Sequence, residues 1–141
     1  MKNKLYILIA LYVVLLGCET EDTRYAYKTV IRNESQVSVE IEEYSNEDLI
    51  SNFIILPYSS SQTLIYISTS FKGYFRNSDS VVFKFANQKG YSCTINRISG
   101  DLCFNSKNPL DFKEPSYFKV SDFSFDYIIT QEDAENALEL H

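Results

Sequence analysis

Apolar and polar residues alternate with a period of two through most of the chain between Tyr25 and Thr130. In the first run, Tyr25, Tyr27, Thr29 and Ile31 alternate with Ala26, Lys28, Val30 and Arg32. Successive side chains of a strand point to opposite faces, so this period is typical of half-buried β-strands. A second alternating run, residues 37–42, follows the short polar segment 33–36. Two such runs joined by a polar turn predict a β-hairpin.

Further short apolar runs predict more strands, at residues 53–57, 63–68, 81–86, 91–95, 102–105, 117–120 and 123–129. Residues 63–68 are almost continuously apolar, which favours a central strand with both faces covered or half-covered. Seven to nine short antiparallel strands within residues 25–130 predict an all-β fold, an immunoglobulin-like or similar β-sandwich. A five- or six-stranded barrel is the alternative, because periodicity does not determine whether a sheet closes.

The C-terminal segment 131–141 follows a helix-start pattern. Thr130 precedes Asp133 by three residues, and Ala134, Ala137 and Leu138 come next. A hydroxyl at the first position and a carboxylate three residues later form a capping box. We therefore expect a short helix or a frayed tail after the sandwich.

The N-terminal segment differs from the rest of the chain. Lys2 and Lys4 precede an uncharged, mainly apolar run at residues 5–16, and Gly17 follows. A helix of twelve residues is about 18 Å long, too short for a hydrocarbon core of about 30 Å. This arrangement predicts a secretory signal peptide at residues 1–17 and an acidic tether at residues 18–24. The alternative is a buried strand or helix at the N-terminus.

The end of this segment, Leu15-Leu16-Gly17-Cys18, resembles the bacterial lipoprotein box. Leu16 departs mildly from the usual Ala or Ser. The resemblance implies that the Cys18 sulfur receives a diacylglyceryl group and that cleavage falls before Cys18. It also implies acylation of the new amino terminus. Several acyl chains together give stable membrane anchoring, whereas one chain alone binds only marginally.

The acidic residues directly after Cys18 resemble the export signal of surface lipoproteins in Bacteroidetes; they include Glu19, Glu21 and Asp22. The chain as a whole resembles small lipoproteins of that group, through the Cys18 box, the β-rich body and the ending 125–133. The resemblance implies a lipid-anchored protein of the outer membrane, surface-exposed or periplasm-facing. Such families carry no assigned activity, so it implies a location and not a reaction.

Processing would change the composition of the chain. The 141 residues include 13 Lys and Arg and 19 Asp and Glu, for a net charge of −6. Loss of residues 1–17 removes Lys2 and Lys4, which leaves 124 residues and a net charge of −8. This acidity argues against a nucleic-acid partner, because such proteins need a basic face.

Cys93 and Cys103 remain as an even pair if Cys18 is lipidated. Both proposed locations are oxidising, so a disulfide is expected. The two cysteines flank the turn-forming residues 99–101, which predicts a hairpin that places them opposite each other. Two free buried thiols are the alternative.

Candidate catalytic chemistry is sparse. The only histidine is His141, a terminal residue that packing cannot orient as a base or as a zinc ligand. Glu40, Glu42 and Glu43 lie together on a predicted strand and its end, where a solvated face is expected. The acids near residue 47 lack calcium-loop spacing. The sequence therefore predicts a non-enzymatic protein without catalytic residues, metal or cofactor.

Aromatic residues in predicted loops are the candidate ligand contacts. Phe71, Tyr74 and Phe75 surround Gly73, and Tyr117 lies in the other long loop. Loop aromatics can stack on sugars or anchor a partner, which makes glycan or peptide capture a second functional hypothesis. The alternative is that these rings fill the core of a small sandwich.

A further short motif is Asp79-Ser80-Val81, which resembles the O-glycosylation acceptor sequence of Bacteroidetes. The resemblance implies a glycan on Ser80. A turn just before a strand is the alternative role for these residues. Asn33-Glu34-Ser35 also fits the N-glycosylation sequon, but a bacterial lipoprotein gives no reason to expect its use.

Overall fold

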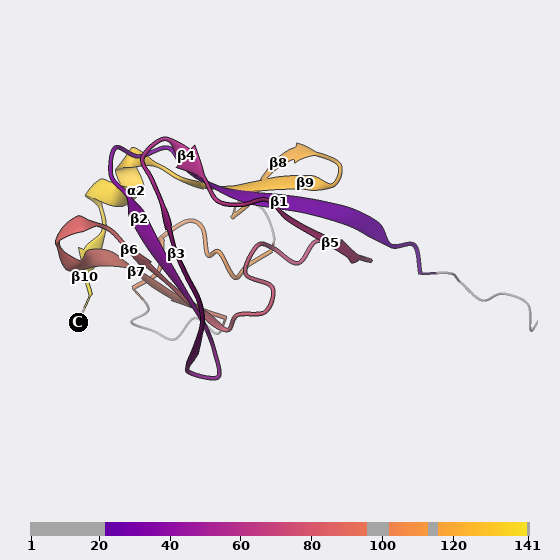
Figure 1. Ribbon diagram of the computed structural model, residues 1–141, viewed down its shortest axis with the longest axis horizontal. Coiled ribbons are helices and arrows are strands. Elements are labelled where there is room, and N and C mark those ends of the chain that lie inside the picture. The colour runs from indigo at the N-terminus through magenta and orange to yellow at the C-terminus, as the bar shows by residue number, and fades with distance from the viewer. Residues whose placement is uncertain (1–21, 96–101, 113–115, 141) are drawn as a thin grey trace, which may run out of the picture.

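Two five-stranded sheets pack face to face in the computed structural model, which describes residues 22–95, 102–112 and 116–140 (Figure 1). The predicted signal peptide, Cys18 and most of the tether lie outside the described residues. The start of β1 and the C-terminal end of the described chain lie at opposite ends of the molecule (Figure 1).

The β1 sheet has β1 near its middle. Its strands are β1 (Tyr25–Asn33), β4 (Ser59–Ser60), β5 (Leu64–Ser68), β8 (Phe118–Ser121) and β9 (Ser124–Ile129). Both β4 and β5 pair antiparallel with β1, while β9 runs parallel to β1 on its other side. β8 pairs antiparallel with β9 and forms the far edge.

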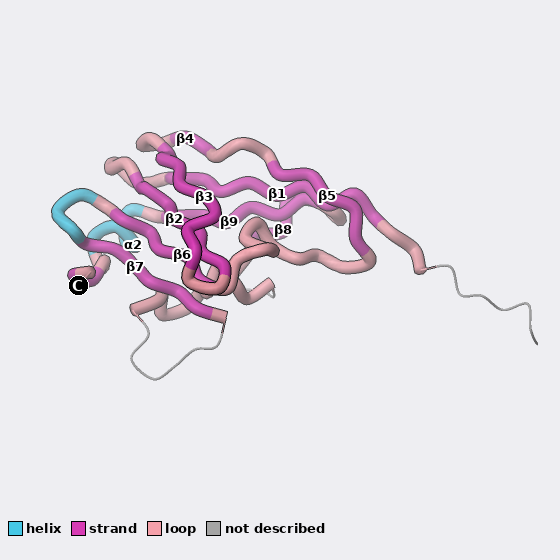
Figure 2. The backbone as a smooth tube through the Cα atoms, turned by 60° about the horizontal axis from the view of Figure 1, so that its bottom comes forward, coloured by secondary structure: helices cyan, strands magenta, loops and turns pink. Residues whose placement is uncertain are grey.

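The β2 sheet is antiparallel throughout. Its strands, in spatial order, are β10 (Leu138–Glu139), β7 (Lys89–Thr94), β6 (Ser80–Lys84), β2 (Val39–Ser45) and β3 (Asp48–Ile55). The short 3₁₀ helix η1 (Ala86–Gln88) connects β6 to β7, and α2 (Gln131–Glu135) precedes β10 (Figure 2). β3 has one neighbour among the described strands, β2, so its outer edge is unpaired.

The predicted all-β sandwich is confirmed, with ten strands in the described residues. The two sheets are separate, so the barrel alternative is wrong. The expectation of antiparallel pairing throughout needs one correction, because β1 and β9 are parallel. That pairing joins segments roughly a hundred residues apart, and no local pattern signals it.

The predicted hairpin between the first two runs is wrong. β1 belongs to one sheet and β2 to the other, so residues 34–38 cross between sheets. The Asn33 side chain holds this crossing. Its Nδ2 donates to the carbonyls of Val37 (2.8 Å), Ile55 (3.2 Å) and Leu56 (3.1 Å). Asn33 is 1 % exposed, so it is also inaccessible as an N-glycosylation site.

The core lies between the sheets and follows the predicted alternation. β1 contributes Ile31, β2 contributes Val39 and Ile41, and β6 contributes Val81 and Phe83, all buried. Burial of this apolar surface is the main favourable contribution to folding, at about 25 cal/mol per Å². The rings of Phe83 and Tyr127 stack across the sandwich, with centroids 5.9 Å apart.

The sequence predicts a central strand at residues 63–68. In the structure β5 is not central, because it lies beside one end of β1 and pairs with that strand alone among those described. Tyr66 faces the core, while Ile65 and Ile67, on the opposite face, are 65 % and 70 % exposed. The apolar run therefore reflects one buried face and one exposed apolar face.

The predicted C-terminal helix is confirmed and is followed by a strand. Thr130 Oγ1 accepts from the N–H of Asp133 (3.2 Å), and Asp133 Oδ2 accepts from the N–H of Thr130 (2.6 Å). β10 then pairs with β7, which joins the C-terminal segment to the β2 sheet. Within the described ranges, no helix is long and apolar enough to span a bilayer.

Candidate functional site

A cleft of about 480 Å³ lies between the free edge of β3 and the segment that joins β4 to β5. Its lining residues are Glu43, Ser51, Phe53, Ile54, Ser60, Ser61, Gln62 and Tyr74. A smaller pocket of about 200 Å³ shares Glu43 and Tyr74 and adds Leu64, Arg76 and Asn77. The shared residues make the two hollows parts of one site, which we call the Glu43 cleft.

Glu43 lies at the end of the inward-facing series of β2. Ile41 and Val39, two and four positions earlier, are fully buried in the core. The Glu43 side chain is half-buried, and its Oε2 accepts from Ser78 Oγ (2.9 Å). A second hydrogen bond comes from Ser51 on β3. Burial raises the pKa of Glu43 above its usual value, and the two serine hydroxyls oppose that change only in part.

Glu43 differs from the neighbouring acids of the same strand. Glu42 points to the outer face, where it pairs with Lys84 Nζ (2.5 Å) and accepts from Tyr44 Oη (2.7 Å). Glu40 accepts from Asn52 Nδ2 (2.9 Å) on that face. Glu43 forms no ion pair with any lysine or arginine in the described part of the chain. The expectation that all three acids share a solvated face is therefore wrong for Glu43, and also for Glu42, which is 9 % exposed beneath its ion pair with Lys84.

Tyr74 brings an aromatic ring to the Glu43 cleft. Its ring packs against Phe53 of β3, with centroids 6.2 Å apart. Its hydroxyl donates to the carbonyl of Gln62 (3.4 Å), and burial raises its pKa. The preceding Gly73 has a φ of +70°, and a Cβ there would lie 2.5 Å from Phe112 Cδ1. Glycine is therefore required for the turn that places Tyr74.

The other loop aromatics predicted as ligand contacts lie in or against the core. Phe75 and Tyr117 are buried, so they cannot contact a ligand at the surface. Tyr117 Oη donates to the Pro109 carbonyl (2.7 Å) and accepts from the Tyr74 N–H (3.0 Å). Phe71 is half-buried and stacks on Phe125, with centroids 4.1 Å apart. Of these residues, Tyr74 is the one that lines the cleft.

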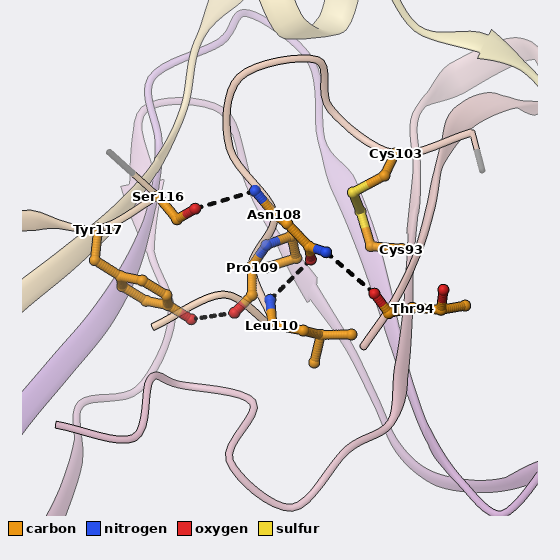
Figure 3. The surroundings of a disulfide bond; sticks show 8 residues. All are labelled: Cys93, Thr94, Cys103, Asn108, Pro109, Leu110, Ser116 and Tyr117. Atoms are coloured by element: carbon orange, nitrogen blue, oxygen red, sulfur yellow. Dashed lines mark hydrogen bonds between the residues drawn. A yellow bond between two sulfur atoms is a disulfide. The ribbon is translucent and has the colours of Figure 1, made fainter. Parts of the chain in front are cut away.

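The predicted Cys93–Cys103 disulfide is confirmed, with Cα atoms 4.6 Å apart (Figure 3). The predicted hairpin is only partly realised in the described residues. Cys93 lies in β7, whereas Cys103 lies outside any strand, in a segment where the Leu102 carbonyl accepts from the Ser92 N–H (3.0 Å). The turn residues 99–101 lie outside the described ranges.

Asn108 forms a further contact between this loop and β7 (Figure 3). Its Nδ2 donates to the Thr94 carbonyl (3.1 Å), and its Oδ1 accepts from the Leu110 N–H (3.0 Å). The Asn108 N–H donates to Ser116 Oγ (3.1 Å), next to Tyr117. The disulfide and Asn108 thus fix the loop that holds Tyr117, which in turn holds Tyr74 at the cleft.

Ser80, the predicted glycosylation residue, is the first residue of β6 and pairs with Tyr44 and Thr94 in the β2 sheet. It is half-exposed and lines a shallow pocket with Tyr44, Glu47, Asp79 and Val82. Glycosylation at Ser80 stays a prediction.

Another pocket, of about 290 Å³, lies beside α2 and includes Lys107 and Asp133. These two side chains form an ion pair (2.5 Å), and Asp133 also caps the helix. The Asp133 carboxylate of this pocket therefore already has a cationic partner, in contrast to Glu43. Within the described residues, no group of three or more His, Cys, Asp or Glu side chains is placed to hold a metal ion.

Comparison with known protein families, curated proteins and solved structures found no match for this chain.

Proposed function

We propose that the protein is a lipid-anchored, non-enzymatic binding module of the outer membrane, surface-exposed or periplasm-facing. The sequence Leu15-Leu16-Gly17-Cys18 supports the anchor. β1 begins at Tyr25, seven positions after Cys18, and seven extended residues span at most about 25 Å. An anchor at Cys18 would therefore keep the sandwich close to the bilayer.

The Glu43 cleft is the observation that supports a binding role. Ligand sites are concave and combine apolar walls with a few convergent polar groups, and this cleft does so with Phe53, Tyr74 and Glu43. Glu43 is its single carboxylate among the described lining residues. Glycoside hydrolysis generally uses two carboxylates on either side of the scissile bond, so binding suits the cleft better than hydrolysis.

The second candidate is a glycan- or peptide-capturing accessory protein that uses loop aromatics. Tyr74 favours this possibility, because its ring lies in the cleft beside Ser61 and Gln62. The partner would then be a surface glycan or protein rather than a nucleic acid.

Metabolic labelling with radioactive palmitate tests the anchor. Wild-type protein should incorporate label, and Cys18→Ala should not. The double variant Cys93→Ala/Cys103→Ala is the matched control, because its cysteines form the disulfide and it should keep the label. Equal labelling of wild type and Cys18→Ala would overturn the anchor proposal.

A further inference from the structure

The carboxylate of Glu43 lacks the cationic partner that other sequestered acids in this fold have. Glu42 pairs with Lys84, Asp126 with Arg32, and Asp133 with Lys107. Glu43 is half-buried, yet its described partners are the hydroxyls of Ser78 and Ser51. Removing a charge from water is unfavourable unless an opposite charge or sufficient hydrogen bonds replace the water. The Glu43 carboxylate therefore has no direct ionic partner among the described residues, and a ligand cation would supply one.

The walls of the Glu43 cleft suit a cation that is carried on an apolar arm. Phe53 and Tyr74 supply aromatic rings close to Glu43, and aromatic faces attract ammonium groups. Arg76 also lines the cleft, but its guanidinium lies over the Tyr66 ring, with Cζ 4.6 Å from the ring centroid, and it forms no ion pair with Glu43. The net charge of the chain is negative, which favours the approach of cations over anions.

We propose that the Glu43 cleft binds a primary ammonium group on an unbranched aliphatic arm. The ammonium group donates to the Glu43 carboxylate, and the arm lies against Tyr74 and Phe53. This inference rests on the proposed binding function and names the chemistry of its ligand.

Two sources carry this ammonium chemistry, a free aliphatic diamine and the lysine side chain of an extended peptide. The free edge of β3 borders the cleft through Ser51, Phe53 and Ile54. Unpaired strand edges accept extended peptides by main-chain hydrogen bonding. A lysine peptide therefore gains contacts that a free diamine lacks.

Isothermal titration calorimetry on the detergent-solubilised mature protein tests the inference. The small probes are cadaverine and its neutral counterpart 1,5-pentanediol. The peptide probes are a blocked hexapeptide with one lysine and its norleucine counterpart. Cadaverine should bind at least about tenfold more tightly than the diol, because charge-assisted hydrogen bonds are the stronger ones. Tighter binding of the lysine peptide than of cadaverine identifies the peptide source, and the reverse order identifies the diamine.

Matched variants separate the cleft from general attraction between opposite charges. Glu43→Gln should weaken cadaverine binding about tenfold, whereas Glu40→Gln, on the outer face, should leave it unchanged. Tyr74→Leu removes the ring and should lower the affinity for cadaverine. Circular dichroism of each variant checks that it is folded.

Three results would overturn the inference. They are equal binding of cadaverine and the diol, equal effects of the Glu40 and Glu43 substitutions, and no binding of any amine probe. Equal binding of the neutral probe would still leave the cleft as a binding site. Failure of palmitate labelling would refute the anchor and leave the amine titration unaffected, so the two proposals fail separately.

Discussion

Asn33→Ala should be among the more destabilising single substitutions in this fold. Asn33 lies where the chain leaves the β1 sheet for the β2 sheet, and its amide donates to three main-chain carbonyls. Its Oδ1 also accepts from the N–H (3.1 Å) and the Oγ (2.7 Å) of Ser35. Because the amide group has two N–H donors, the three carbonyls share them, and alanine removes this whole set of contacts at a position that water does not reach.

The size of the effect follows from which partners keep another hydrogen bond. The Leu56 carbonyl still accepts from Ser59, and the Val37 carbonyl still accepts from Ser35 Oγ. Each buried polar group left without its partner costs about 1–3 kcal/mol, and each lost hydrogen bond about 1 kcal/mol. A total loss of about 3 kcal/mol follows, a fifth or more of the stability of a typical domain.

Urea denaturation measures this loss, followed by far-UV circular dichroism because the chain has no tryptophan. With a slope of about 1.5 kcal/mol/M, the midpoint of Asn33→Ala should fall by about 2 M at unchanged slope. Asn52→Ala is the control. Asn52 is exposed on β3 and its side chain donates to Glu40 at the surface, so its loss should cost about 0.5 kcal/mol or less. Equal midpoints for the two variants would refute the structural role of Asn33.

Three other predictions concern the disulfide, Gly73 and Glu43. Cys93→Ala/Cys103→Ala should lower the free energy of unfolding by about 3 kcal/mol, the loop-closure estimate for eleven residues, and urea denaturation would measure it. Gly73→Ala combines a strained φ with a clash against Phe112 and should cost about 1–3 kcal/mol in calorimetry. The pKa of Glu43 is raised in the folded state. The protonated side chain therefore stabilises the fold at pH values below the ordinary pKa of glutamate, and this stabilisation is lost as the pH rises through the folded-state pKa. Urea denaturation at several pH values would give the free energy of unfolding of the wild type and of Glu43→Gln. The wild-type value minus the variant value should fall with rising pH, and a rise would contradict a raised pKa for Glu43.

Features set by residues close in sequence were predictable. The capping box depends on Thr130 and Asp133, three positions apart, and both strand alternation and the even cysteine pair are likewise readable from the chain. Each depends on a local distance or on simple chemistry.

Features set by sheet topology were not predictable. Residues 33–36 have the polar composition of a hairpin turn, and composition does not reveal that the chain changes sheets there. β5 is apolar on both faces, yet only its position beside β1 determines that Ile65 and Ile67 are exposed. The parallel pairing of β1 with β9 depends in the same way on distant segments.

Two polar residues continue an inward-facing series, and their hydrogen bonding distinguishes their roles. Asn33 follows Thr29 and Ile31 at alternate positions of β1, and Glu43 follows Val39 and Ile41 of β2. The alternation alone places both residues on the core side. This signal was missed for Glu43 because its sequence neighbours Glu40 and Glu42 suggested a single acidic face. The amide of Asn33 is fully used by its own chain, so its role is structural.

Glu43 has hydroxyl partners but no described cation, and its burial raises its pKa, so its charged form is unfavourable in the unliganded fold. A charge held at such a cost to stability is typical of a binding site, where function and stability are in conflict. The proposal for the cleft therefore carries a second consequence. Near neutral pH, Glu43→Gln should unfold at the same temperature as wild type or a higher one while it loses affinity for the amine probe. A variant that lost both stability and affinity would instead assign Glu43 a structural role like that of Asn33.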